Sequence, residues 1–564
     1  MDPLKYIVPG RKRLPYGMMN FAVIRREDYY YVDKTRFIPM IEEADRFFFF
    51  IRPRRFGKSL TLNLLQHYYD VRTRDRFEDL FGDLYIGQHP TPSRNTYLVL
   101  YLNFSGITGE LNNYRKGLDA HCGITFENFC KKYADLLPQG TPEGLCAVSG
   151  AVEQLDYLYQ ACERAGQKMY LFIDEYDHFT NAILADPESL HRYTNETHGE
   201  GYLRAFFNKV KAGTYSSIER CFITGVSPVT MDDLTSGFNI GTNYSLTPEF
   251  NQLMGFTEEE VREMLTYYST TSPFHHTVDE LIEIMKPWYD NYCFAQKSYG
   301  GTTMYNSNMV LYFVKNYILY GNAPDNMVEE NIRIDYEKLR MLIRKDKEFA
   351  HDASVIQTLV SQGFITGELK TGFPASGITN PDNFVSLLYY FGMLTISGTH
   401  EGKTKLTIPN LVVQEQLYTY LLNTYNDADL SFSSYEKSEL ASLLRLHRRL
   451  PENLRLAARQ AERRVLRSRF HSRHDRAEPL LPPRLRTGHA GGLRRHLPLP
   501  HAGHLLRHDA QLHRGAEICQ IQRSRNPRGR IASGSHRPSQ PLRRYRHGEA
   551  RHRQHPPAQD CGGI

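Results

Sequence analysis

The sequence predicts an α/β protein with a parallel sheet of the P-loop NTPase class. The first indication is the apolar run Phe47 to Ile51, which has the length of a buried strand and leads through a basic turn into Gly57-Lys58-Ser59. Apolar residues then recur at the spacing of one helix face, at Leu60, Leu64 and Leu65. The second indication is Met169 to Asp177, an apolar run that ends in acidic residues. Open α/β sheets bind ligands beyond the carboxyl ends of their strands, where both turns would lie.

The turn after the first strand has the residue types of a phosphate-binding loop. Backbone N–H groups at a helix start carry partial positive charge, and a glycine lets the chain approach phosphates closely. Lys58 would reach the β- and γ-phosphates and Ser59 would bind magnesium. The predicted nucleotide-binding residues are Arg55, Phe56, Gly57, Lys58, Ser59 and Leu60. One departure from G-x-x-x-x-G-K-[ST] is Arg52, which stands where the first glycine is usual.

The second strand supplies the carboxylates that such a site needs. Asp174 is predicted to hold Mg²⁺ together with Ser59, and Glu175 is predicted to orient the attacking water as the catalytic residue. The alternative for this stretch is an ordinary strand followed by an acidic turn. Taken with the phosphate-binding turn, the pair predicts ATP and Mg²⁺ as cofactors.

Several further motifs follow in an order that resembles a known family. They are Tyr31-Val32-Asp33-Lys34-Thr35, Arg52 to Ser59, Phe172 to Asp177, Phe222 to Ser227, Gly255 to Glu260, Tyr289 to Tyr292 and Tyr305-Asn306. Over roughly residues 10 to 440 the chain resembles the bacterial AAA-ATPase-like family. The resemblance implies an ATPase domain, followed in many members by a PD-(D/E)XK nuclease domain, and an arginine at position 52 is common in it. It also supports Thr224, at the tip of a predicted strand, as a sensor of the γ-phosphate.

Two more strands are expected in the ATPase core, at residues 97–104 and 219–224, with helices at 110–166 and 201–213. A strand added to the sheet, with glutamate next to the metal-side aspartate, is the arrangement of the additional-strand (AAA/STAND-like) class of P-loop ATPases. Asp33 before an apolar stretch is interpreted either as a helix cap or as part of a nucleotide-proximal motif.

The predicted domains are a lead-in at 1–30, the ATPase core at 31–245, a helical lid at 246–320, a connector at 321–442 and a tail at 443–564. Thr257 followed by Glu260 predicts a capping box at the start of the lid. Trp288 and its tyrosine neighbours would either stack on adenine or belong to a core. The connector combines helices with a short β pattern and is expected to be winged-helix-like.

Composition limits the classes of protein. At 41% hydrophobic and 23% charged residues, the chain is ordinary for a globular protein of two to four domains. No segment has the apolar length of a membrane span, and the N-terminus lacks the apolar core of a signal peptide. We therefore expect a cytoplasmic protein without a membrane partner. The eight cysteines form no C-x-x-C pair, so neither a disulfide framework nor a zinc site is indicated.

The tail differs sharply from the rest of the chain. From Arg445 onward it holds 27 arginines, 13 histidines, no lysine and eight acids, a net charge of +19, whereas the remainder carries −13. The tail also contains few large apolar residues, and a segment of this composition is predicted to be disordered. One interpretation is a basic arm that binds nucleic-acid phosphates, but such arms use lysine as well as arginine. The other, which we favour, is a frameshift that replaced the nuclease domain, because parts of the tail can be back-translated in a shifted frame to an E-x-K motif.

The function that these patterns predict is ATP binding with slow hydrolysis, without nuclease activity in this chain. The alternative is a nucleotide-gated interaction or DNA-binding module that binds ATP without turnover. DNA, a protein partner and an oligomer are left open.

Overall fold

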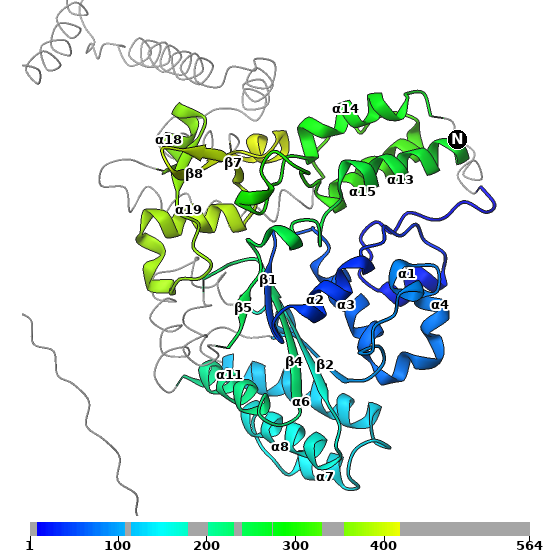
Figure 1. Cartoon of the computed structure of the whole chain (residues 1–564), viewed down its shortest axis with the longest axis vertical. Coiled ribbons are helices and arrows are strands. Elements are labelled where there is room, and N and C mark those ends of the chain that lie inside the picture. Colours follow the sequence, from blue (N-terminus) through cyan, green and yellow to red (C-terminus); the bar gives the residue numbers. More distant parts are fainter. Residues whose placement is uncertain are drawn as a thin grey trace, which may run out of the picture. The chain divides into compact units, whose positions relative to one another are not determined.

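The structure is a computed structural model that describes residues 8–107, 114–178, 201–229, 240–272, 274–329 and 355–417 (Figure 1). The predicted tail at 443–564 lies outside these residues, as do 330–354 and 418–442 of the predicted connector and 1–7 of the lead-in. In the part of the chain that the structure describes, no helix is both long enough and apolar enough to cross a membrane.

A five-stranded parallel sheet forms the centre of the ATPase core, and this confirms the predicted fold class. Its strands are β1 (Phe47–Ile51), β2 (Leu98–Asn103), β3 (Met169–Asp174), β4 (Ile218–Gly225) and β5 (Thr242–Asn243), in the order β2-β3-β4-β1-β5. Strand β3 is buried throughout and β1 along four of its five residues, which explains why both stretches are continuously apolar. The strand that separates β1 from β3 in space is β4, and β2 forms an edge beside β3. Phe50 of β1 pairs with Thr224 of β4, so the strand ends that carry the site lie in register.

Helices connect the strands. The core contains α2 (Ile38–Glu43), α3 (Lys58–Tyr69), α4 (Phe77–Phe81), α5 (Tyr85–Gln88), α6 (Tyr114–Lys132), α7 (Thr141–Cys146), α8 (Ala151–Arg164) and α11 (Tyr202–Gly213). Helix α3 contacts β2 and β3, while α8 packs against α6 and α11 (Figure 1). Because α3 begins directly after the turn that follows β1, its first N–H groups lie beyond the carboxyl edge of the sheet.

The lead-in contains a short helix, α1 (Phe21–Arg26). Asn20 caps this helix by accepting a hydrogen bond from the backbone N–H of Val23. Phe21 is fully buried, and its backbone N–H donates to Asn63 Oδ1 of α3 over 2.8 Å. The lead-in is therefore anchored beside the helix that carries Lys58 and Ser59.

The described part of residues 246–320, the predicted lid, contains three α-helices, α13 (Glu258–Thr271), α14 (Val278–Tyr289) and α15 (Ser307–Tyr320) (Figure 1). The predicted capping box is present, since the Thr257 side chain accepts from the Glu260 N–H and the Glu260 carboxylate accepts from the Thr257 N–H. These helices share an apolar core of their own, which includes fully buried Tyr289, and the partly buried Trp288 packs against it. Tyr289 is thus a core residue, and Trp288 lies at the edge of the same core.

The described part of the connector combines α18 (Val355–Gln362) and α19 (Pro381–Tyr390) with an antiparallel sheet. Its strands are β6 (Ile365–Gly367), β7 (Thr395–His400) and β8 (Lys403–Thr407), in the order β6-β8-β7. Apolar residues of this region join the same core as the ATPase sheet. The expectation that this region is winged-helix-like stays a prediction.

Candidate nucleotide site

The turn between β1 and α3 has the backbone that a phosphate cradle requires. Gly57 caps α3 in the left-handed region with φ 95°, and Arg55 lies there too, with φ 66°. A Cβ on Gly57 would meet no atom within 4 Å, so glycine is favoured here by its conformation and not by lack of space. The N-terminus of the twelve-residue helix α3 is thereby presented at the turn.

Lys58 lies across this turn. Its Nζ donates to the carbonyl oxygens of Arg52 and Pro53, each over 3.0 Å, and the residue is only 8% exposed. Burial lowers the pKa of Lys58, and the nearby Asp174, Asp177 and Glu175 oppose this effect. A cation is therefore held next to the predicted phosphate position.

Ser59 and Asp174 meet in the fold. The Ser59 hydroxyl donates to Asp174 Oδ2 over 2.7 Å, and the Tyr101 hydroxyl donates to the same oxygen over 3.2 Å. Asp174 is fully buried, and burial raises its pKa while the hydrogen bond from Ser59 and the charge of Lys58 lower it. The two turns that were predicted to form one site are thus in contact.

This donor set fits Mg²⁺. Magnesium takes hard oxygen ligands, and in nucleotide sites it uses one or two protein oxygens together with phosphates and water. Within the described ranges no group of three or more His, Cys, Asp or Glu residues could hold a metal by itself. Ser59 and Asp174 would therefore hold the ion together with the nucleotide and not in a cage made by the protein alone.

Glu175 lies at the wall of a cavity, and its backbone is in the left-handed region with φ 50°. This conformation, which is strained for a non-glycine residue, occurs directly after the last residue of β3. Asp177, which the sequence analysis did not assign, is buried and accepts hydrogen bonds from the N–H groups of Val226 and Ser227. It ties the turn after β3 to the turn after β4.

Thr224 lies at the carboxyl end of β4, beside β1, as the sequence predicted. Its side chain is fully buried, and its hydroxyl donates to the Phe50 carbonyl over 2.6 Å. Thr224 and Asp174 do not line the cavity, whereas Lys58, Ser59 and Glu175 do. The γ-phosphate role of Thr224 stays a prediction.

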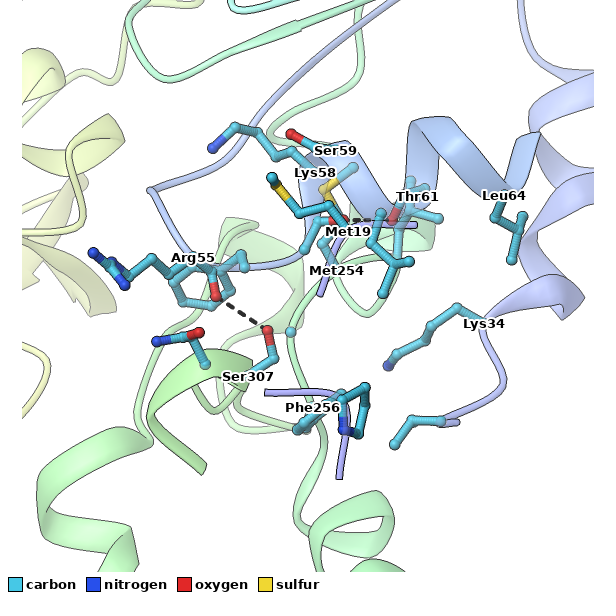
Figure 2. Close-up of a pocket in the computed structure, with 18 of the residues that line it drawn as sticks. Met19, Lys34, Arg55, Lys58, Ser59, Thr61, Leu64, Met254, Phe256 and Ser307 are labelled. Carbon is cyan, nitrogen blue, oxygen red and sulfur yellow. Dashed lines mark hydrogen bonds between the residues drawn. The ribbon is translucent and has the colours of Figure 1, made fainter. Parts of the chain in front are cut away.

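The cavity has a volume of about 590 Å³, and both polar and apolar residues line it (Figure 2). The polar lining includes Arg54, Arg55, Lys58, Ser59, Thr61 and Glu175. The apolar lining comes from the lead-in, α2, α3 and the start of the predicted lid, and includes Met18, Met19, Tyr30, Phe37, Ile38, Leu64, Met254, Phe256 and Met264. The contribution of the lead-in could not be predicted from the sequence, because nothing in the local pattern of residues 8–30 shows which cavity they border.

Lys34 of the Asp33-Lys34-Thr35 motif also lines this cavity, and Figure 2 shows it on the side opposite Arg55. Its Nζ donates to Glu260 Oε2 over 2.6 Å and to the Gln252 carbonyl over 3.1 Å. Asp33 meanwhile accepts hydrogen bonds from both the N–H and the hydroxyl of Thr35. Asp33 thus makes a local turn with Thr35 and is not the N-cap of the helices that follow, whereas Lys34 joins the cavity wall to the capping box at Thr257 and Glu260.

Arg52, at the position of the usual first glycine, is a buried structural cation. Its guanidinium donates to the carbonyl oxygens of Ile51, Ser245 and Phe250 over 2.8 to 3.1 Å and lies 4.1 to 4.2 Å from the ring centres of Phe50 and Phe294. Burial lowers the pKa of Arg52 to about 10. The side chain points into the core, so its presence does not obstruct the turn.

Parts of this chain are similar to known proteins. Residues 15–235 match the model of a family described as Predicted AAA-ATPase. A protein from Azotobacter chroococcum mcd 1, described as an uncharacterized protein in the vnfD 5′ region, is 26% identical over 429 residues, which cover 74% of this chain and 71% of that protein. The crystal structure of Cdc6p from Pyrobaculum aerophilum aligns with a TM-score of 0.24 and 11% identity, covering 66% of this chain and 87% of that one. Residues 15–235 are therefore similar to the Predicted AAA-ATPase family.

Proposed function

We propose that this chain binds ATP with Mg²⁺ in this cavity and slowly hydrolyses the ATP, releasing its γ-phosphate. The observation that carries the proposal is the hydrogen bond from Ser59 to Asp174, made beside Lys58 and Glu175. A metal-side hydroxyl, a metal-side carboxylate, a phosphate-side cation and a carboxylate at the cavity wall are the parts that phosphoryl transfer to water needs.

Each residue has a part in the proposed reaction. The N–H groups of the turn and the ammonium of Lys58 bind the β- and γ-phosphates. Ser59 and Asp174 hold the magnesium ion, which when bound neutralises charge on the phosphate oxygens. Glu175 accepts a hydrogen bond from the attacking water and orients it, and Thr224 is proposed to report on the γ-phosphate from the end of β4.

The apolar side chains that line the cavity would contact the base of the nucleotide. Aromatic and methionine side chains offer flat and adaptable apolar contact to a ring system. Tyr30 and Phe256 both line the cavity, although Tyr30 comes from the predicted lead-in and Phe256 from the predicted lid. Base binding would therefore bridge two predicted domains, which supports a lid that responds to nucleotide.

The test uses full-length protein with two variants. Lys58→Ala is expected to lower ATP affinity by at least about a hundredfold, because the phosphates lose their buried cation. Glu175→Gln is expected to bind ATP within about threefold of wild type and to lose phosphate release, because the amide cannot take the proton of water. Equal ATP affinity in wild type and Lys58→Ala would overturn the site.

The same measurement separates hydrolysis from the alternative, a nucleotide-gated module without turnover. Wild-type protein that binds ATP but releases no more phosphate over hours than Glu175→Gln would favour the module. DNA or a protein would then be the partner of the bound state.

We also propose that the arginine-rich tail arose by a change of reading frame and carries no nuclease. Its lack of lysine and its 27 arginines support this. Sequencing the encoding DNA across codons 435 to 450 against a relative's gene would show one inserted or missing base, and Mg²⁺-dependent cutting of plasmid DNA by the purified chain would contradict the proposal.

A further inference from the structure

The N-terminus of lid helix α15 is bonded to the phosphate-binding turn. The Ser307 hydroxyl and the Asn308 N–H both donate to the Arg55 carbonyl, over 3.1 and 3.4 Å, and Asn306 Nδ2 donates to the Arg54 carbonyl over 3.5 Å. Figure 2 shows the bond between Ser307 and Arg55. The Tyr305-Asn306 motif therefore places the lid on the turn that precedes Gly57.

The side chain of Arg55 adds an ionic contact to this junction. Its Nη1 lies 3.5 Å from Oε2 of Glu329, and Asn308 Nδ2 donates to the same oxygen over 3.0 Å. Glu329 is only 7% exposed, so its carboxylate depends on these partners for compensation of its charge. The Tyr16 hydroxyl also bonds to Glu329, and burial together with this carboxylate raises the pKa of Tyr16. The buried carboxylate of Glu329 thus contacts groups from the lead-in, the turn and the predicted lid.

Arg55 is positioned between two anions if the proposed function holds. It is a cavity-lining residue two positions before Gly57, and its left-handed φ of 66° is a conformation that a non-glycine residue adopts only at an energetic cost. The 3.5 Å separation from Glu329 is at the long limit of a hydrogen bond. A phosphate offers a guanidinium two parallel charge-assisted bonds, which are stronger.

We propose that Arg55 and Glu329 form a switch that distinguishes nucleoside triphosphate from diphosphate. In the diphosphate state the guanidinium pairs with Glu329, and in the triphosphate state it pairs with the γ-phosphate. Glu329 then competes with the γ-phosphate for Arg55, and its release alters the contacts of Asn308 at the start of α15. A ligand shifts a conformational equilibrium only by its difference in affinity for the two states, and here the γ-phosphate supplies that difference.

The inference rests on the proposed function and is tested by binding in full-length protein, with Mg²⁺-ADP and the non-hydrolysable Mg²⁺-β,γ-imido-ATP as probes. Arg55→Ala is expected to weaken the triphosphate about tenfold and ADP less than about twofold. Glu329→Gln is expected to strengthen the triphosphate about threefold or more and to leave ADP unchanged, because the competing charge is removed while the shape is kept.

The double variant gives the decisive measurement. If the two residues act as a pair, Glu329→Gln has no effect on triphosphate affinity once Arg55 is alanine. Additive effects would overturn the switch, as would equal changes for both nucleotides. Arg55→Lys, which keeps the charge but loses the two-pronged geometry, should lie between wild type and Arg55→Ala.

Controls separate this inference from the function on which it rests. Glu258→Gln removes a lid carboxylate that is paired with Lys286 over 2.6 Å and is expected to leave the ratio of the two affinities unchanged. ADP affinity shows in each variant that the site is folded. Failure of wild type to bind either nucleotide would count against the proposed function, whereas normal binding with an unchanged ratio in Arg55→Ala and Glu329→Gln would count against the switch alone.

Discussion

Ser59 and Asp174 are 115 residues apart in the sequence, and the hydroxyl of one donates to the carboxylate of the other over 2.7 Å. The sheet produces this contact, because β3 and β1 are parallel strands with only β4 between them. Asp174 is the last residue of β3 and Ser59 follows the turn after β1, so both reach the same edge of the sheet. The order of the strands in the sheet therefore brings the residues of the site together. Each of these residues can be tested by substitution.

Ser59→Ala is expected to remove most of the effect of magnesium on ATP binding. With the hydroxyl gone, the ion keeps Asp174 but loses a protein ligand, so the ratio of affinities with Mg²⁺ and with EDTA should fall about tenfold. Titration calorimetry in both buffers measures this ratio. Ser59→Thr keeps the hydroxyl and serves as the control, and an unchanged ratio in Ser59→Ala would exclude Ser59 as a magnesium ligand.

Lys34→Met is expected to destabilise the protein by about 3 kcal/mol, because the buried Glu260 carboxylate keeps only the longer contact of 3.7 Å with the exposed Arg36 as its ion pair. The Glu260 side chain is only 11% exposed. Adding Glu260→Gln should restore most of the loss, since the amide oxygen still accepts from the Thr257 N–H. Thermal unfolding midpoints of the single and double variants measure the effect. A double variant as unstable as Lys34→Met would show that the pairing of charges is not the cause.

Arg52→Gly restores the glycine of the usual motif and is nevertheless expected to lower the unfolding midpoint by roughly 5 °C or more. The substitution leaves the Ser245 and Phe250 carbonyls without their donor and opens a cavity between the Phe50 and Phe294 rings. ATP affinity should not rise. A glycine variant as stable as wild type would mean that the buried arginine is dispensable.

Acid is expected to destabilise the protein partly through His67. Burial, with a smaller contribution from Arg76, lowers the pKa of His67 to about 4, whereas the unfolded chain has the ordinary value of about 6.5. The folded state therefore favours the neutral ring. The contribution to stability is complete above pH 6.5 and is lost as the pH falls from about 6.5 toward 4.

His67→Gln cannot take up this proton, so its unfolding midpoint should fall less than that of wild type between pH 7 and pH 4.5. The comparison is made by thermal unfolding at the two pH values. Parallel losses in wild type and variant would exclude His67 as a source of the acid sensitivity.

The sequence predicts those parts of the fold that depend on local pattern. The apolar run of β1, the glycine turn and the acids after β3 are all visible in single stretches, and the capping box of Thr257 and Glu260 needs only four residues. Such features have the same physical cause in the isolated segment and in the folded protein.

Other parts could not be predicted because they arise from contacts between distant segments. Nothing near Met18 or Met19 indicates that they border a nucleotide cavity, and nothing near Glu329 indicates that it pairs with Arg55. Arg52 looked like a flawed motif position, and only the fold shows that its side chain points away from the turn toward carbonyls almost 200 residues later.

The partners of Arg52 also limit how the molecule can be divided. The family match ends at residue 235, but Ser245, Phe250 and Phe294, which surround this guanidinium, come after that point. Expression of residues 15–235 alone would expose a lone arginine together with the apolar wall that Phe294 and Tyr389 cover. A fragment meant for enzymology should therefore extend at least to Leu417, and an insoluble shorter fragment would reveal a missing part of its core and not a fault in the ATP site.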